Sequence, residues 1–139
     1  MDVTIREYGS EDRDAVIRIW NEVFSDGTPH NDPSLSLKRK VGMGDGLLLL
    51  AQKDGKVVGT VMGGYDGHRG WIYSLAVLPD YRRNGIATKL LGEMQKKLSE
   101  LGSPKINLQV REDNAGVIEF YRKCGFEVER RVSMGKKLY

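Results

Sequence analysis

Apolar side chains recur at helical spacing in three segments of the chain, each of which predicts a helix. The strongest pattern runs from Gly85 to Leu101, and Gly102 follows it as a stop signal. A fourth helix, roughly 33–41, is predicted because Asn31-Asp32-Pro33 is typical of a helix start. The stripes are Ala15, Val16, Ile19, Trp20, Val23 and Phe24; Ile86, Leu90, Met94, Leu98 and Leu101; and Val117, Phe120, Tyr121 and Cys124.

Between these segments lie short apolar or alternating runs that predict strands. Asp54-Gly55 is a hairpin signal, and residues 66–70 are rich in turn formers. The order β-α-α-β-β-β-α-β-α-β-β predicts a single domain over residues 1–139, of α/β (α+β) class with a mixed sheet. The predicted strands are 4–7, 47–53, 56–65, 71–77, 105–111, 126–130 and 132–138.

Composition narrows the class of protein. The 139 residues fit one domain, and 40% hydrophobic with 29% charged residues is typical of a globular protein. Cys124 is the single cysteine, which excludes an internal disulfide and favours a reducing compartment. The longest apolar run, Leu47 to Ala51, is too short to span a membrane, and the first residues do not form a signal peptide. We therefore expect a cytoplasmic protein with no membrane contact.

The net charge of +3 comes from 22 basic and 19 acidic residues that are interleaved along the chain. No run of five like charges occurs, which disfavours nucleic-acid binding. A small polyanionic ligand explains a local basic excess equally well.

The segment from Val77 to Leu91 carries the clearest chemistry. A predicted strand ends, Arg82 and Arg83 follow, and Gly85 opens a long helix. The first turn of a helix has unpaired N–H groups and the positive end of the helix dipole, so it binds phosphate. The pattern is neither a Walker loop nor a dinucleotide fingerprint, because the Gly-Lys-Ser/Thr and the additional glycines are lacking.

Arg82-x-x-Gly85-x-Ala87 resembles the acetyl-CoA signature Q/R-x-x-G-x-G/A of GNAT acetyltransferases. A second block, from Asn114 to Phe126, resembles the other signature of that family, and the order of elements matches over essentially the whole chain. The likeness is greatest to small bacterial members related to the ribosomal-protein alanine acetyltransferases. It implies a mostly antiparallel sheet of six to seven strands flanked by about four helices, and acetyl transfer from acetyl-CoA to an amine.

The resemblance implies two groups of cofactor-binding residues. Backbone groups of Leu75, Ala76 and Val77 would align the pantetheine arm and polarise the thioester carbonyl, although their side chains would be ordinary core residues. The loop would otherwise be a solvated basic turn with a helix-opening glycine. The residues implied to hold the pyrophosphate are Arg82, Arg83, Asn84, Gly85, Ile86, Ala87 and Thr88.

In the second block, Asn114 resembles the family's cofactor-contacting asparagine, but asparagine is also a favoured helix cap. Tyr121 matches the catalytic tyrosine that protonates the departing CoA thiolate; the alternative is a tyrosine that packs on an amphipathic helix. Cys124 has no histidine nearby in sequence, which disfavours a covalent acyl-enzyme. His30 and His68 lack metal-ligand spacing, so no metal is expected.

The chain departs from the related ribosomal-alanine enzymes at one position. They carry Glu in L-E-V-R, thought to be their base, where this chain reads Leu108-Gln109-Val110-Arg111. An amide cannot accept the proton, so we expect water or a group elsewhere to take it, and acetylation of a protein N-terminus is in doubt. Gln109 either contacts the substrate or fills the groove wall; Asp66, His68 and Glu112 are weaker candidates for the base.

The predicted function is thus an N-acetyltransferase acting on a primary amine, of a small molecule or of a peptide or protein, by direct attack in a ternary complex. The alternative is a non-catalytic acyl-CoA-binding or regulatory module of the same fold. The sequence leaves open the amine, the acyl chain length and a possible homodimer. We expect the acceptor beside the two N-terminal helices, the 42–46 loop and the 66–70 turn, whose aspartates are either cation ligands or turn residues.

Overall fold

The structure is a computed structural model that describes residues 2–24 and 32–138. It divides into two compact units, Met1–Gln109 and Val110–Tyr139, which we describe separately. The elements of the first unit are β1 (Val3–Glu7), α1 (Arg13–Phe24), α2 (Pro33–Met43), β2 (Leu48–Lys53), β3 (Lys56–Tyr65), β4 (Gly70–Val77), α3 (Ile86–Glu100) and β5 (Ile106–Leu108). The second unit contains α4 (Ala115–Lys123).

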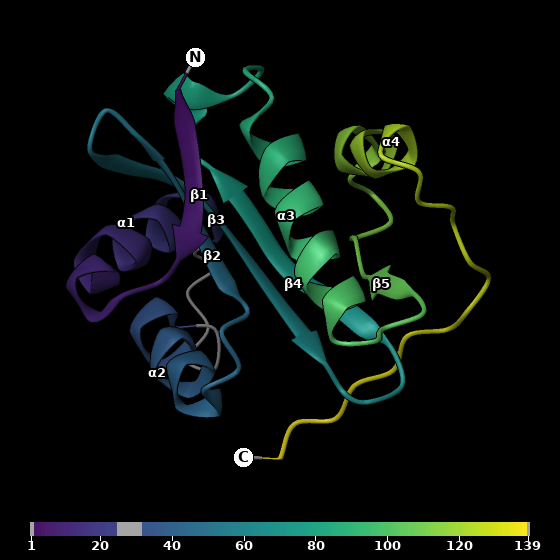
Figure 1. The fold of residues 1–139 in the computed structure, drawn as a ribbon. Coiled ribbons are helices and arrows are strands. Elements are labelled where there is room, and N and C mark those ends of the chain that lie inside the picture. The colour runs from purple at the N-terminus through teal and green to yellow at the C-terminus, as the bar shows by residue number, and fades with distance from the viewer. Residues whose placement is uncertain (1, 25–31, 139) are drawn as a thin grey trace. The chain divides into compact units, whose positions relative to one another are not determined.

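The first unit is built on one mixed sheet whose strand order follows the chain, β1-β2-β3-β4-β5 (Figure 1). The first four strands are antiparallel, and β5 joins β4 in parallel after the α3 crossover. The β2–β3 hairpin turns at Asp54 and Gly55, which have φ of 51° and 77°. Both residues are left-handed, as the tightest hairpin turns require, so this predicted turn is confirmed.

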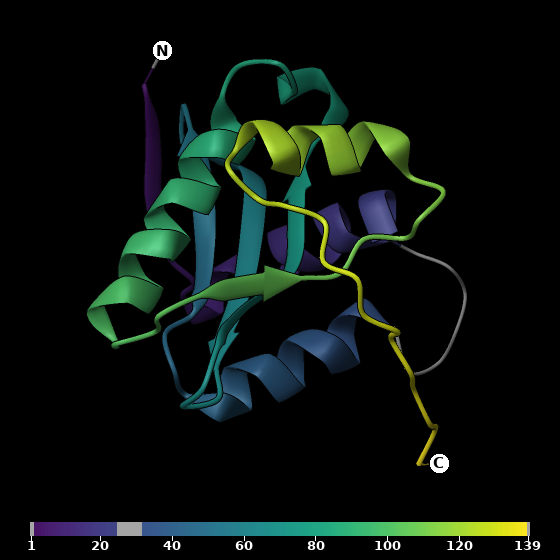
Figure 2. The same ribbon diagram turned by 90° about the vertical axis from the view of Figure 1, so that its right-hand side faces the viewer.

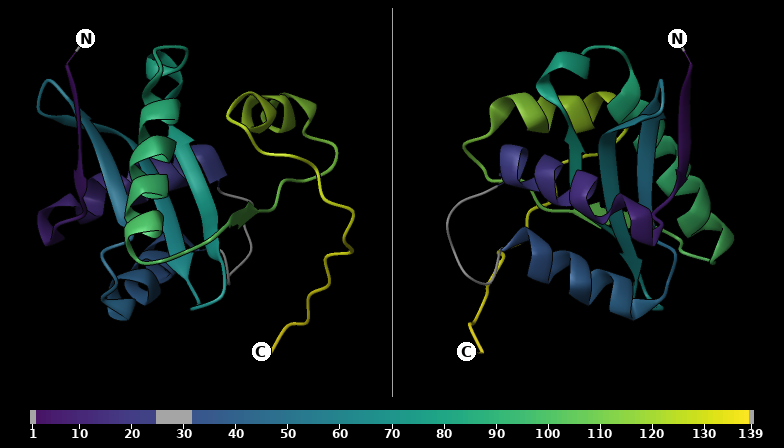
Figure 3. Two further views of the ribbon diagram at one scale, coloured as in Figure 1. Left: turned by 45° about the vertical axis from the view of Figure 1, so that its right-hand side comes forward. Right: turned by 90° about the vertical axis from the view of Figure 1, so that its left-hand side faces the viewer.

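Helices cover both faces of this sheet. Helix α3 packs on one face, with Leu90, Met94 and Leu98 fully buried, whereas α1 and α2 lie on the other (Figures 2 and 3). On the α1 face the Trp20 indole donates a 2.9 Å hydrogen bond to the hydroxyl of Thr60, which is also buried. The core is therefore two layers of apolar side chains, one on each side of the strands.

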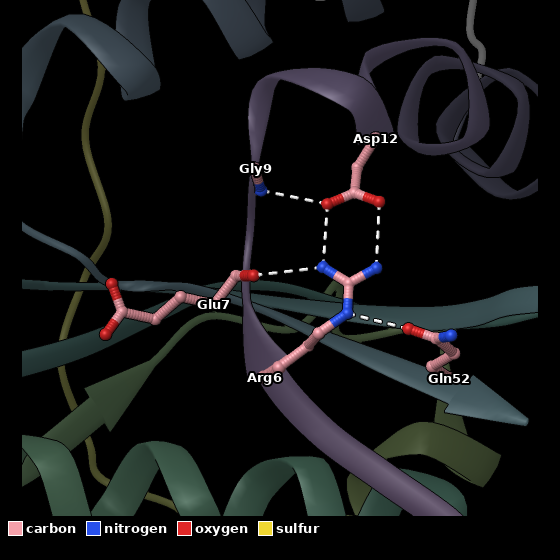
Figure 4. A network of polar contacts seen from close by, with 5 residues as sticks. All are labelled: Arg6, Glu7, Gly9, Asp12 and Gln52. Carbon is pink, nitrogen blue, oxygen red and sulfur yellow. Dashed lines mark hydrogen bonds and ion pairs between the residues drawn. The ribbon is translucent and has the colours of Figure 1, made fainter. Parts of the chain in front are cut away.

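A polar network ties β1 to the start of α1 and to β2 (Figure 4). The Arg6 guanidinium donates to both carboxylate oxygens of Asp12 at 2.7 and 2.9 Å and to Gln52 at 2.7 Å. Asp12 is only 5% exposed and also accepts from the Gly9 N–H. The hydrogen bonds from Arg6 lower the pKa of Asp12, because they stabilise its charged form.

The second unit consists of α4 and the segment that follows it. The Asn114 side chain caps α4 by accepting from the Val117 N–H at 3.3 Å. Residues 126–138 contain no strand, so the predicted strands 126–130 and 132–138 are wrong. Val132 and Met134 are 87% and 90% exposed, and no strand pairs with this segment. Alternating apolar residues can form the apolar face of a strand, but a strand is stable only when a neighbouring strand pairs with it.

The α/β class with a mixed sheet is confirmed, and residues 2–24 and 32–138 contain four α-helices and five strands in place of the predicted six or seven. The predicted strand 105–111 is shorter than expected, because β5 covers only Ile106–Leu108. The turn formers Asp26-Gly27-Thr28-Pro29 predict where the first helix ends, but they lie outside the described residues. The single domain stays a prediction. In the part of the chain that the structure describes, no helix is both long and apolar enough to cross a membrane.

Candidate active site

The loop between β4 and α3 makes a sharp, partly strained turn. Pro79–Tyr81 forms one turn of 3₁₀ helix, Arg82 is extended, and Arg83 and Gly85 are left-handed with φ of 64° and 77°. This conformation is ordinary for Gly85 but costs about 1 kcal/mol or more for Arg83. Residues are held in such conformations mainly at functional sites, which makes this loop a candidate site.

The N-terminus of α3 has no side-chain cap. The Lys89 N–H donates to the Gly85 carbonyl at 3.0 Å and starts the helical ladder. The N–H groups of Ile86, Ala87 and Thr88 therefore have no helical carbonyl partner. A Cβ built on Gly85 would meet no atom within 4 Å, so the space beside this residue, at the helix end, is open. An anion placed there would meet both the donors and the positive end of the helix dipole.

Basic side chains lie in and beside the loop that precedes this helix. Arg83 is exposed, and Arg82 donates its Nε–H to the Val77 carbonyl at 2.9 Å, which leaves the rest of its guanidinium for other partners. The ammonium groups of Lys53 and Lys56 lie 5.7 and 5.6 Å from the centre of the Tyr81 ring, in range for cation–π contact. Four cations thus gather around a loop that holds one aspartate, Asp80.

Helix α3 is held to β1 at two points along its length. Lys89 Nζ donates to the Val3 carbonyl at 2.6 Å, and Lys97 Nζ pairs with Glu7 at 2.9 Å. Together with the buried stripe of α3, these contacts fix where its N-terminus lies against the sheet.

The edge of β4 is unpaired over its second half. The pairing with β5 ends at Ile72 and Leu108. Residues 74–77 of β4 therefore pair with β3 on one side and, among the described residues, have no strand partner on the other. The Leu78 N–H donates to the Val58 carbonyl of β3. Because backbone groups alternate in direction along a strand, those of Leu75 and Val77 point to the open edge, whereas those of Ala76 point to β3.

Tyr121, in the second unit, is half-buried among aromatic rings. Its ring contacts those of Phe120 and Phe126 edge to face, at centroid distances of 5.2 and 5.5 Å. Burial, with a smaller contribution from Cys124, raises the pKa of Tyr121 to about 12. The phenol is therefore protonated at any physiological pH.

Several polar residues considered for the acceptor site have structural partners. Asp32 caps α2, and Asp66 accepts from the N–H groups of His68 and Arg69 at 2.7 Å each, as expected of turn residues. Asp45 pairs with Lys40 at 2.8 Å. Gln109 is exposed at the end of the first unit, and its role stays a prediction. Asp26 and His30 lie outside the described residues.

Comparison with known proteins decides the family. The model of the Acetyltransferase (GNAT) family matches residues 13–126. This chain belongs to the GNAT acetyltransferases. An acetyltransferase of Pectobacterium atrosepticum is 46% identical over 134 residues, 96% of this chain and 94% of that protein, and acetyltransferases of Yersinia pestis are 44% identical over the same shares. The predicted enzyme class is thereby confirmed.

Solved structures show the same fold as this GNAT acetyltransferase. Ard1 from Thermoplasma volcanium has a TM-score of 0.78 and 28% identity, over 93% of this chain and 85% of that one. The PaiA N-acetyltransferase from Thermoplasma acidophilum, solved with coenzyme A, has a TM-score of 0.82 and 21% identity, over 95% and 94% of the two chains. The aminoglycoside N-acetyltransferase AAC(6')-Iy, also solved with CoA, has a TM-score of 0.82, 20% identity and coverage of 99% and 96%.

In this acetyltransferase the first unit brings together most of the predicted cofactor residues. The open edge of β4, with Leu75 and Val77, leads through Arg82 to the uncapped helix end at Gly85. Asn114 and Tyr121 belong to the second unit, and their catalytic and binding roles stay predictions. No three His, Cys, Asp or Glu side chains of the described residues gather as a metal site would require, and the absence of a metal stays a prediction.

Two features of this region were missed in the sequence. Tyr81 with Lys53 and Lys56 forms a cluster only because the β2–β3 hairpin lies beside the loop. The β4 strand also contains a bulge at Tyr73. The positions of Lys53 and Lys56 on either side of the Asp54-Gly55 turn were a usable signal for the first feature; nothing local marked the second.

Proposed function

We propose that this GNAT acetyltransferase transfers the acetyl group of acetyl-CoA to a primary amine by direct attack in a ternary complex. The observation that carries the proposal is that an unpaired strand edge leads directly to an uncapped helix N-terminus. The unpaired edge of β4 ends at Val77, and the loop that follows leads to a helix N-terminus with no cap. Acetyl-CoA has an extended arm with amide groups, followed by a pyrophosphate. The amides suit the strand edge and the pyrophosphate suits the helix N-terminus, in the same order as along the chain.

In this proposal the pyrophosphate lies at the N–H groups of Ile86, Ala87 and Thr88, with Arg82, Arg83 and Asn84 around it. The pantetheine amides add to the edge of β4 as a short strand would, through the groups of Leu75 and Val77. A backbone N–H of this edge then faces the thioester carbonyl and stabilises the negative charge that develops on its oxygen. Ala76 is left out of the cofactor contacts, because its backbone groups point to β3 and its side chain is buried in the core.

The chemical step needs no covalent enzyme intermediate. The neutral amine nitrogen attacks the thioester carbon, the C–N bond forms and the C–S bond breaks. The nitrogen releases a proton to water, and CoA leaves as a thiolate. We assign no enzyme base, because Gln109 stands where the related enzymes carry Glu and an amide does not accept a proton at neutral pH.

The pKa of Tyr121 defines what this residue can contribute. With a pKa of about 12 against about 8.5 for a thiol, the phenol is the weaker acid by roughly 5 kcal/mol. Complete proton transfer to the thiolate is therefore uphill. We assign Tyr121 to donating a hydrogen bond to the leaving sulfur, and solvent then supplies the proton. Such a bond to a charged acceptor contributes about 1.5–3 kcal/mol.

The similar proteins support the cofactor but not one acceptor. PaiA and AAC(6')-Iy were solved with CoA, and the second is an aminoglycoside N-acetyltransferase. For this chain the acceptor is proposed only as a primary amine of a small molecule or of a peptide. A location in the reducing cytoplasm, supported by the single Cys124, belongs to the same proposal. The non-catalytic binding module remains the alternative, and it would bind acetyl-CoA without needing Tyr121.

The test measures CoA release with a panel of amines, polyamines and peptides, for the native protein and for Tyr121→Phe. We expect a kcat lower by at least about tenfold in the variant, with little change in acetyl-CoA affinity, since only the bond to the leaving sulfur is lost. Tyr8→Phe, which makes the same change beside the core of the first unit, is the matched control. Full activity of Tyr121→Phe on the best acceptor would remove Tyr121 from the mechanism, and acetyl-CoA binding with no acceptor in the panel would favour the module.

A further inference from the structure

A bulge in β4 separates Tyr73 from the ladder just before the residues proposed to hold the thioester. Met62 of β3 pairs with Ser74, but the next residue, Gly63, pairs with Ile72, so Tyr73 has no partner on β3. The pairing with β5 also ends at Ile72. Bulges re-aim side chains and are frequent beside active sites. Tyr73 lies two residues before Leu75 on the same strand.

The ring of Tyr73 is presented over a glycine and remains open to solvent. A Cβ on Gly64 would lie 2.7 Å from the Tyr73 ring, so any side chain at that position would displace the ring. Tyr73 is nevertheless 60% exposed, on a strand whose other side chains are mostly covered. The backbone of β3 thus supports one edge of the ring and leaves most of the rest accessible to a ligand.

Two carboxylates act on the Tyr73 phenol, and one cation lies nearby, because the Lys40 ammonium donates to the carbonyl of Gly63. Burial, and then the charges of Asp66 and Asp45, raise the pKa of the Tyr73 phenol. Asp45 is paired with Lys40, which offsets its charge. Asp66 accepts from the uncharged N–H groups of His68 and Arg69, and it forms no ion pair among the described residues. Its carboxylate therefore keeps its full charge, and the pKa of Asp66 is lowered by those same bonds.

Next to Tyr73, the hydroxyl oxygen of Ser74 is buried and has no hydrogen-bond partner within the part of the chain that the structure describes. An unsatisfied buried hydroxyl costs about 1–3 kcal/mol, so it is uncommon in a native protein unless a ligand or water completes it. The bulge, the exposed ring and this hydroxyl lie together on two consecutive residues.

We propose that Tyr73 and Asp66 bind a second cationic group of the acceptor, so that the preferred substrate is a diamine-like molecule with an ammonium a short chain away from the reacting nitrogen. The inference rests on the proposed function, which puts the thioester at the open edge of β4, where Leu75 and Val77 lie. Two residues of extended strand span about 7 Å, which is the reach of a short diamine. An ammonium over the tyrosine ring gains cation–π attraction, and the Asp66 carboxylate adds charge attraction.

The physical reason to assign this site to the distal cation is the protonation of the reacting nitrogen. The nitrogen that attacks must be neutral, and a site that stabilised its ammonium form would raise its pKa and oppose the reaction. A site for a second ammonium gives binding energy without that cost. It also selects against an amine that carries a carboxylate in the same position, because Asp66 repels it.

Three acceptors of equal chain length test this inference, namely putrescine, butylamine and 4-aminobutyrate, compared at one pH and ionic strength. We expect kcat/KM to fall in that order, with roughly a tenfold advantage of putrescine over butylamine. Tyr73→Ala and Asp66→Asn should bring the two amines to within about twofold of each other. Tyr73→Phe should retain most of the preference, because it keeps the ring.

Asp54→Asn is the matched control, since it removes one negative charge at the other end of β3 and should leave the preference unchanged. Putrescine binding to the protein is measured in parallel by calorimetry, with and without CoA. Weaker putrescine binding in Asp66→Asn than in the native protein supports the cation site even if no acetyl transfer is detected. A native protein that does not bind acetyl-CoA refutes only the proposed function. Equal use and equal binding of putrescine and butylamine by the native protein, or an unchanged preference in Tyr73→Ala, would overturn the inference.

Discussion

The N-termini of α2 and α3 are built in opposite ways within one compact unit. Asp32 caps α2 by accepting from the Leu35 N–H at 3.1 Å. Pro33 occupies the first turn, where a backbone N–H would have no partner within the helix and its absence costs nothing. At α3 a left-handed glycine takes the cap position and leaves the first N–H groups open. The α2 terminus is closed to strengthen the helix, whereas the α3 terminus gives up that stabilisation and keeps its donors for an anion.

Helix α4 extends the comparison. Asn114 closes the N-terminus of α4 with its side chain, as Asp32 does for α2. Of the two interpretations of Asn114, the cap is present in the structure, and the cofactor contact stays a prediction. Among the helices whose N-terminal residues are described, α3 is thus the one whose first turn follows a left-handed glycine.

The largest expected effect comes from filling the open terminus. Gly85→Glu should weaken acetyl-CoA binding by at least about a hundredfold, because a carboxylate would occupy the place of the pyrophosphate. The open space around Gly85 lets the variant fold, at a cost of about 1 kcal/mol for a left-handed non-glycine residue. Calorimetric titration with acetyl-CoA measures the effect.

Gly92→Glu makes the same substitution on the exposed face of α3, where a Cβ also meets nothing within 4 Å, and should leave affinity intact. Gly85→Ala separates backbone strain from charge and should retain most of the binding. Unchanged affinity in a folded Gly85→Glu protein would show that acetyl-CoA binds elsewhere.

Measurements over a range of pH separate cofactor binding from the chemical step. We expect kcat/KM to change about tenfold for each pH unit. Without an enzyme base, log kcat/KM should rise with slope one up to the pKa of the acceptor amine, while the acetyl-CoA Kd stays flat, since arginines and backbone N–H groups do not titrate there. Tyr121 acts in its protonated form and has a pKa of about 12, so it should cause no loss of activity near pH 10.

His68→Ala and Glu112→Gln should both preserve this rising limb. An enzyme pKa of about 6 to 7 that disappears in either variant would reveal an internal base and contradict the prediction.

Asn114→Ala should have a smaller effect that distinguishes its two interpretations. As a cap alone, the residue contributes about 1 kcal/mol to α4, and its loss should lower the thermal midpoint without changing acetyl-CoA affinity. A tenfold or greater rise in Kd in the folded variant would instead assign Asn114 to the cofactor as well.

The smallest expected effect is that of Asp32→Ala. It should cost about 1 kcal/mol in unfolding free energy, measured by urea denaturation, and should leave the acetyl-CoA Kd within twofold. A large loss of affinity in this variant would break the comparison, because it would link the closed terminus to the cofactor.

Features carried by local sequence were predictable. The stripe of α3, the Asp54-Gly55 turn and the opening of α2 at Asp32 all follow from periodicity, turn chemistry or capping within a few residues. The open terminus at Gly85 was predictable for the same reason, because a strand, a basic loop and a glycine precede the helix in sequence.

Features that depend on distant partners were not predictable. The Arg6–Asp12–Gln52 network joins residues 46 positions apart, and the bulge at Tyr73 exists only as a difference in register between β3 and β4. The last two strands were predicted from alternation alone, which cannot show whether a neighbouring strand is present. The early end of β5 at Leu108 likewise has no local signal, although it creates the open edge of the candidate site.

The open edge of β4 also has a consequence for how the protein behaves in solution. Unpaired backbone groups on a strand are a template for pairing with another chain, and natural proteins keep such edges short. Here the edge is only residues 73–77, and Arg82 occupies the carbonyl of Val77 at its end. A cofactor arm that pairs with this edge would act as a removable protecting strand, so the protein without acetyl-CoA should self-associate more readily during purification and storage than the same protein kept saturated with it.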